Sequence, residues 1–168
     1  MPKIIQNLEQ KLLEEAERQI REHGYSATTV RSVAKACGVG VGTVYNYFSS
    51  KEALLASYML EDWKKCIAAI EAVSTYCDTP KPVVRCICDQ LQLFAQRHEA
   101  VFRDEGAAAA FHGSFSPDHS LLRSQLAAPL EKFCDDSFKA AFIAESLLVW
   151  TMAGKDFDTI YTVVKKLL

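Results

Sequence analysis

The chain has 168 residues, of which 49% are hydrophobic and 24% are charged, a balance that is ordinary for a water-soluble globular protein. This length suffices for one domain or two small ones with a substantial core. The formal net charge of −2 argues at first against a protein that binds nucleic acid. No apolar run approaches the roughly 18 residues that span a bilayer, and no secretory segment follows Met1, so we expect a cytoplasmic protein.

The first predicted element is a helix over Ile4–His23. Its apolar side chains fall on one face, at Ile5, Leu8, Leu12, Ala16 and Ile20. Gly24 is placed to end this helix, and Tyr25 is expected to fold back onto the core.

Thr28–Lys51 predicts two short helices joined by a tight turn. The first has an apolar face with helical spacing, made by Val30, Val33, Ala34 and Cys37. Thr28 or Thr29 can cap it through a side-chain oxygen, and Gly38 can end it in a left-handed conformation. The second helix turns Val41, Val44 and Phe48 inward. Two short helices with such a turn form a helix-turn-helix, whose second helix enters the major groove of DNA.

Glycines stand at positions 40 and 42, where each costs a helix roughly 1 kcal/mol relative to alanine. A helix that must approach a phosphate backbone gains from bare positions at its leading end, although a plain loop is the alternative. Charge supports the DNA interpretation, because residues 24–51 contain Arg31, Lys35 and Lys51 and no acid. The local field at the contacting face matters more for DNA affinity than the net charge does.

Residues Gly24–Leu55, GYSATTVRSVAKACGVGVGTVYNYFSSKEALL, resemble the DNA-binding segment of the TetR family of transcriptional repressors. The resemblance is specific over about 50 residues, and only the size and helical character of the remainder fit. It implies an all-α protein with an N-terminal three-helix helix-turn-helix DNA-binding domain, residues 1–49, and a C-terminal helical ligand-binding and dimerisation domain, residues 50–168. The residues that it implies for contact with double-stranded DNA are Thr28, Thr29, Gly42, Thr43, Tyr45, Asn46, Tyr47 and Lys51, the last one on phosphate. Gly40 and Val41 depart from the polar residues of many relatives, so direct base readout is expected to be sparse.

The remaining chain predicts further helices. One begins at Ser49 or Ser50 and runs about 25 residues, because no glycine or proline interrupts it before Pro80. The others are expected over Val83–Arg97, around Glu99–Ala110, over Leu121–Asp135 with Pro129 shortening or kinking it, over Ser137–Ala153, and over Phe157–Leu168 with Asp156 as its cap.

The last two helices carry apolar residues on more than one face, which predicts contact with a second copy of the chain. The expected interface comprises Phe138, Phe142, Val149, Trp150, Phe157, Ile160 and Val164. A homodimer also suits the DNA interpretation, because two recognition helices can then meet two half-sites. The alternative is a monomer that buries both faces internally.

A pocket for a small apolar or amphipathic ligand is a further expectation, raised by the resemblance, since the family senses small molecules in this region. The candidate lining residues are Met59, Trp63, Phe94, His98, Phe102, Phe111, Phe133 and Phe142, with Arg97, His112 and Glu145 as other polar anchors. From the residues alone, aromatic side chains of this kind are more often part of an ordinary core than of a pocket.

No motif predicts an enzyme, a metal or a cofactor. The sequence lacks GxSxG, HExxH, CxxC and a phosphate-binding glycine loop. The six cysteines are expected to be reduced and packed as small hydrophobes, and a redox-sensitive pair such as Cys77 with Cys88 stays an alternative. An enzyme using Glu145 lacks any matching partner.

The sequence therefore predicts a dimeric DNA-binding regulator, most simply a repressor released by a small molecule. The rival is a helical dimeric interaction protein that has lost or weakened DNA binding, which the net charge and the bare positions at residues 39–42 favour.

Overall fold

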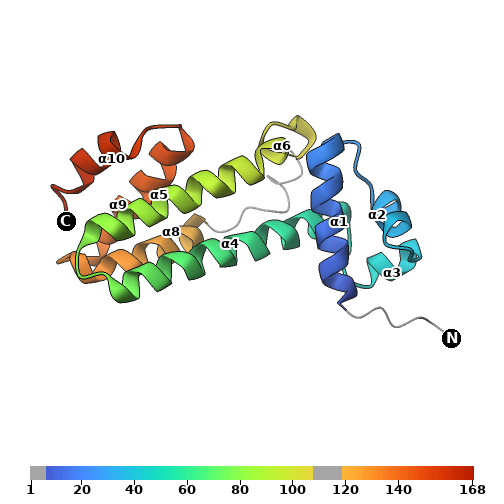
Figure 1. Ribbon diagram of the computed structural model, residues 1–168, viewed down its shortest axis with the longest axis horizontal. Coiled ribbons are helices and arrows are strands. Elements are labelled where there is room, and N and C mark those ends of the chain that lie inside the picture. The colour runs from blue at the N-terminus through green and yellow to red at the C-terminus, as the bar shows by residue number, and fades with distance from the viewer. Residues whose placement is uncertain (1–6, 108–118) are drawn as a thin grey trace. The chain divides into compact units, whose positions relative to one another are not determined.

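The structure of the protein is a computed structural model that describes residues 7–107 and 119–168 (Figure 1). Every regular element in these ranges is a helix, so the predicted all-α fold is confirmed. The helices are α1 (Leu8–His23), α2 (Val30–Ala36), α3 (Val41–Tyr45), α4 (Lys51–Tyr76), α5 (Pro80–Arg97), α6 (Glu99–Phe102), α8 (His119–Ala127), the 3-10 helix η1 (Ala128–Phe133), α9 (Ser137–Met152) and α10 (Phe157–Val164). None of the described helices is both long enough and apolar enough to cross a membrane.

The described chain divides into two compact units. The first contains residues 7–61 and 98–107, and the second contains residues 62–97 and 119–168. The predicted boundary between residues 49 and 50 therefore falls inside the first unit. The reason is that α4 is continuous, and Leu54 and Leu55 in its first turns are buried.

Local signals account for the boundaries of the first unit's helices. Gly24 ends α1 with a φ of 85°, and its N–H donates to the carbonyl of Ile20. Tyr25 is buried directly after this turn, as the sequence predicts. The hydroxyl oxygen of Ser50 accepts a hydrogen bond from the N–H of Ala53 at 3.1 Å and so caps the start of α4.

The second unit packs α5, α8, η1, α9 and α10 with the later turns of α4 around one core. The largest fully buried residues of this core are Ile70, Ile87, Leu91, Leu126, Leu130, Ile143 and Leu147. Pro129 shortens the predicted helix over Leu121–Asp135: α8 ends at Ala127 and the chain continues as 3-10 helix. The side chain of Asp136 caps α9 and that of Asp156 caps α10, which ends at Val164 instead of the predicted Leu168.

The last turn of α4 is closed by residues from η1. The Nζ atom of Lys132 donates to the carbonyl oxygens of Ser74 and Cys77, the latter at 2.7 Å. The hydroxyl of Ser74 in turn donates to the carbonyl of Pro129 at 3.1 Å. Carbonyls at the end of a helix have no partner within it, so these bonds satisfy groups that would otherwise need water.

All six cysteines are free thiols. Cys66 and Cys88 are buried, and burial raises the pKa of both thiols above the ordinary value. Protonated, buried thiols pack as small apolar groups, which agrees with the prediction from sequence. The alternative pairing of Cys77 with Cys88 is not formed, and Cys88 is enclosed in the core of the second unit.

Candidate nucleic-acid interface

The start of α2 is fixed by a reciprocal pair of hydrogen bonds. The Thr29 hydroxyl oxygen accepts from the N–H of Ser32 at 3.0 Å, and the Ser32 hydroxyl oxygen accepts from the N–H of Thr29 at 3.0 Å. This is a capping box with serine in the position that glutamate usually takes. Of the two threonines that the sequence offers as the cap, Thr29 is therefore the one used.

The turn between α2 and α3 depends on Gly38, whose φ is 68°. Its N–H donates to the carbonyl of Lys35 at 3.2 Å, and the N–H of Val39 donates to the carbonyl of Ala34 at 3.0 Å. This pair of bonds defines a Schellman motif, in which a left-handed residue ends the helix. Glycine takes that conformation without the penalty that a Cβ atom imposes.

The helix α3 has one buried face and one exposed face. Val44 and, just after the helix, Phe48 are buried, whereas Tyr45 and Tyr47 expose about half of their surface. Gly42 and Asn46 are also exposed and Thr43 is half-buried. The residues predicted to face outward are thus exposed or half-buried in the first unit. Val41, which is predicted to face inward, is only half-buried.

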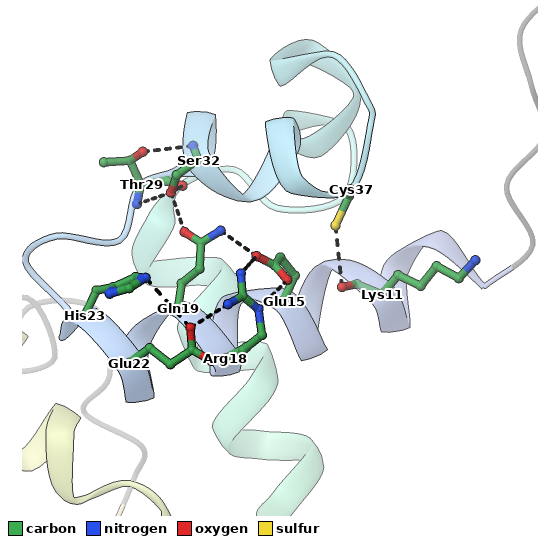
Figure 2. A network of polar contacts seen from close by, with 9 residues as sticks. All are labelled: Lys11, Glu15, Arg18, Gln19, Glu22, His23, Thr29, Ser32 and Cys37. Atoms are coloured by element: carbon green, nitrogen blue, oxygen red, sulfur yellow. Dashed lines mark hydrogen bonds and ion pairs between the residues drawn. The ribbon is translucent and has the colours of Figure 1, made fainter.

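A network of polar side chains joins α2 to α1 (Figure 2). The Ser32 hydroxyl donates to Oε1 of Gln19 at 2.5 Å, and Nε2 of Gln19 donates to Oε1 of Glu15 at 2.7 Å. Arg18 holds both Glu15 and Glu22, and its hydrogen bonds lower the pKa of the Glu15 carboxyl. Gln19 is buried, so these hydrogen bonds satisfy an amide group that would be costly to bury without partners.

A hollow of about 480 Å³ opens beside the exposed face of α3. It is lined by the segment before α2, the first turn of α2, α3 and the start of α4, through Ser26, Thr28, Thr29, Val30, Arg31, Val41, Tyr45, Ser49, Ser50, Lys51 and Glu52. Hydroxyl groups and two cations dominate its polar lining, and Glu52 is its one acid. Such a surface suits the phosphate groups of a nucleic acid backbone, which accept hydrogen bonds and attract positive charge.

Lys51 lines this hollow but is held from inside the protein. Its ammonium group donates to the carbonyl oxygen of Tyr25 and lies 3.7 Å from the centre of the Tyr25 ring. Burial lowers the pKa of Lys51. The Tyr25 hydroxyl donates to Oε1 of Glu52 at 3.0 Å, and burial, together with this carboxylate, raises the pKa of Tyr25 to about 12.

Thr28, predicted to contact DNA, instead uses its hydroxyl within the protein. It is buried, and its hydroxyl donates to the carbonyl oxygen of Gly24 at 2.9 Å. Because its hydroxyl is bonded to the carbonyl of Gly24, Thr28 stabilises the connection between α1 and α2.

Arg31 is a candidate contact that the sequence prediction missed. It is exposed, lies in the first turn of α2 and lines the hollow. The signal was present in the sequence, since Arg31 is a cation directly after the capping threonine in a segment that contains no acid.

The predicted ligand-pocket residues are divided between the first and the second unit. In the first unit Met59 and His98 are buried and Phe102 is half exposed, with the His98 ring 4.8 Å from that of Tyr58. In the second unit Trp63 packs edge-on against Phe94 at 5.6 Å and donates to Oε1 of Gln125 at 2.7 Å. Phe133 packs against the second unit's core, Phe142 is exposed, and Phe111 and His112 lie outside the described residues. Trp63 is therefore a core residue with Phe94 packed against the same core, whereas Phe142 lies exposed on α9 among the described residues.

The predicted dimer residues divide in the same way. Phe138, Phe142, Val149 and Trp150 on α9 are exposed, whereas Phe157, Ile160 and Val164 on α10 are buried in the chain's own core. The prediction is wrong for these last three residues, because the apolar face of α10 packs within the second unit.

The short, crossed helices α2 and α3, their glycine turn and the exposed second helix define a helix-turn-helix protein. Residues 12–58 match the family model of bacterial regulatory proteins, tetR family. This segment thus matches the tetR family, and the resemblance found in the sequence is confirmed for it.

Curated proteins that are similar to this chain over the same segment are HTH-type transcriptional regulators. The chain is 35% identical over 77 residues to the HTH-type transcriptional regulator YuxN of Bacillus subtilis, a match that covers 46% of this chain and 26% of that protein. It is 39% identical over 56 residues to the HTH-type transcriptional repressor AcnR of Corynebacterium efficiens, covering 33% and 30% of the two chains. The aligned segment thus spans less than a third of either relative.

Among solved structures, the tetR-family repressor AlkX from Dietzia sp., implicated in biodegradation of n-alkanes, superposes with a TM-score of 0.65 over 94% of this chain and 98% of that one. The sequence identity is 15%, so this likeness is one of fold. The likeness of fold covers most of this chain and is not confined to the helix-turn-helix.

Proposed function

We propose that this protein is a transcriptional regulator that binds operator DNA as a homodimer and acts as a repressor released by a small apolar or amphipathic ligand. The observation that carries the DNA part is the free surface of α3. Tyr45, Asn46 and Tyr47 are exposed there, while Val44 and Phe48 anchor the helix from below. A helix presented in this way fits the major groove.

The side chains around this surface have separate roles in the proposal. Thr43, Tyr45 and Asn46 meet base edges or nearby phosphates, and Tyr47 and Thr29 contact the backbone. Arg31 supplies the exposed cation beside the hollow, where a phosphate group would release a bound counterion on contact. Lys51 is the inner cation of the same hollow and keeps Tyr25 in place.

The dimer part of the proposal is supported by α9. Phe138, Phe142, Val149 and Trp150 expose half or more of their surface on one helix, and Leu121 on the neighbouring α8 is exposed as well. Large apolar side chains gathered on one surface favour burial against another chain. A homodimer would offer two recognition helices, one for each half-site of an operator.

Release by a ligand rests on the family and on the helical second unit. The test is mass spectrometry of small molecules that co-purify with the chain, followed by DNA titration with and without the compound found. A ligand can weaken DNA binding only if it prefers the conformation that binds DNA less well.

The central experiment is an electrophoretic mobility shift with duplex DNA from upstream of the chain's own coding sequence, at two salt concentrations. We expect retardation that weakens steeply as salt rises. The matched variant is Asn46→Ala, which leaves the charge unchanged and removes a polar group at the exposed residue directly after α3. No retardation of any duplex at low salt would favour the rival function, a helical interaction protein.

A further inference from the structure

The peptide group between Tyr25 and Ser26 is held at both ends. Its carbonyl oxygen accepts from Nζ of Lys51 at the start of α4, and its N–H donates to Oδ2 of Asp104 at 3.3 Å. The Ser26 hydroxyl donates to the same carboxylate oxygen at 2.9 Å. Asp104 follows α6 and lies 78 positions along the chain from Ser26, so this contact is tertiary and not a local turn.

Both carboxylate oxygens of Asp104 are used. Oδ2 receives the two bonds from Ser26, and Oδ1 accepts from the N–H of Ala107 at 3.0 Å. These bonds lower the pKa of Asp104, the one from Ala107 most strongly. The approach is close: a Cβ atom at Gly106 would stand 3.1 Å from Oδ1 of Asp104 and 3.6 Å from the Ser26 hydroxyl. Asp104 therefore fastens the segment after α6 to the connection between α1 and α2.

The peptide group between Tyr25 and Ser26 lies in the connection that leads from α1 into α2. The Tyr25 carbonyl also accepts from the N–H of Thr28 at 3.1 Å, and Thr29 directly afterwards caps α2. Ser26, Thr28 and Thr29 all line the hollow. A shift of this peptide would therefore move the cap of α2 and one wall of the hollow.

We propose that Asp104 is a positioning residue for DNA binding: by holding Ser26, it keeps the first turn of α2 and the hollow in the geometry that receives the DNA backbone. The inference rests on the proposed DNA-binding function. Asp104 itself touches no DNA in this proposal and acts through Ser26.

Asp104 could affect DNA binding through its negative charge or through its hold on Ser26, and the two effects would change the affinity in opposite directions. Removing an acid near a DNA-binding face reduces repulsion of phosphate and should strengthen binding. Removing a positioning residue should weaken it. The control is Glu105→Ala, which removes the same charge from the adjacent, exposed residue.

The experiment measures the affinity of full-length variants for a duplex that the wild-type chain has selected from a random library, with circular dichroism to confirm folding. We expect Asp104→Ala to weaken binding by about 5- to 10-fold, as for the loss of one or two hydrogen bonds, and Glu105→Ala not to weaken it. The slope of affinity against salt should stay at the wild-type value, because no phosphate contact is lost. Ser26→Ala should cost less in the Asp104→Ala background than alone.

Equal affinities of Asp104→Ala and Glu105→Ala would overturn the inference, as would a loss explained wholly by the unfolded fraction. If Asp104→Ala does not fold, Asp104→Asn keeps the shape and one acceptor, and its weaker binding with an unchanged salt slope decides the question. A wild-type chain that selects no duplex would defeat the proposed function itself, and that outcome is visible before any variant is made.

Discussion

The ammonium group of Lys51 lies 3.7 Å from the centre of the Tyr25 ring and donates a hydrogen bond to the carbonyl oxygen of the same residue. The family resemblance places this lysine, the first residue of α4, in contact with a DNA phosphate group. In the structure its ammonium group contacts Tyr25, and the residue also lines the hollow. Arg31 has no such internal role in the described contacts and is exposed. The two cations of the hollow should therefore respond differently to mutation.

We predict that Arg31→Ala weakens binding to all DNA sequences and lowers the salt slope by about one unit, because one phosphate contact is lost. Lys51→Ala should also weaken binding, but should lower the melting temperature as well, since Tyr25 loses its partner. The measurement is DNA titration at several salt concentrations beside thermal unfolding. An Arg31→Ala variant with the wild-type slope would remove Arg31 from the interface.

Gly42→Ala separates stability from DNA binding. No atom of the protein lies within 4 Å of a Cβ placed at Gly42, and alanine favours a helix by up to about 1 kcal/mol over glycine. We expect unchanged or slightly higher stability toward urea and weaker DNA binding, because in the proposed complex the added methyl group would face the DNA. Unchanged affinity would show that α3 does not approach DNA at this position.

Thr29→Ala should destabilise the protein by about 1 kcal/mol, the usual cost of removing a helix N-cap. Thr29→Ser keeps the hydroxyl that accepts from Ser32 and serves as the control. Urea unfolding of the three proteins checks this expectation. Equal losses in both variants would assign the effect to the missing methyl group instead of the cap.

Trp150→Glu should weaken the proposed homodimer by about tenfold or more, because a tryptophan that becomes buried at the centre of an interface carries much of the binding energy. Val163→Glu makes a comparable change at an exposed apolar residue of α10 and should leave the dimer intact. Sedimentation equilibrium measures both. If Val163→Glu dissociates the dimer and Trp150→Glu does not, the interface lies on α10 and not on α9.

Asp62 should make stability depend on pH at the acidic end. Burial raises the pKa of this carboxyl, but bonds from Arg97 at 2.9 Å and Lys65 at 3.2 Å outweigh burial and hold the pKa below its ordinary value. A lowered pKa in the folded state adds stability that is present above the unfolded value, about 3.9, and is lost as the pH falls through the folded value. The melting temperature of Asp62→Asn should therefore lie below that of the wild type at neutral pH and approach it in acid. Asp89→Asn, an exposed position on α5, should show no such convergence.

Features set by neighbouring residues were predictable from the sequence. The cap at Asp156, the left-handed Gly38 and the inward face of Val44 and Phe48 all follow from local spacing and backbone preference. Thr28 and Thr29 could not be told apart, because the choice depends on the bond from Thr28 to Gly24 and on Ser32.

Features set by tertiary packing were not predictable. An apolar stripe such as that of Phe157, Ile160 and Val164 has the same periodicity whether it meets its own chain or a partner. The structure places this stripe in the chain's own core and leaves Phe138 and Trp150 outside. Likewise, no spacing rule joins Ser26 to Asp104, which contact each other from distant parts of the chain.

Because Lys132 donates hydrogen bonds to the carbonyls of Ser74 and Cys77, the stability of the C-terminal end of α4 depends on η1. When residues 128–133 detach, those carbonyls lose their donor and the final turn frays. Amide protons of that turn and of η1 should therefore exchange with solvent at a common rate. The C-terminal end of α4, the longest of the described helices, should then melt only together with a segment more than fifty residues further along the chain.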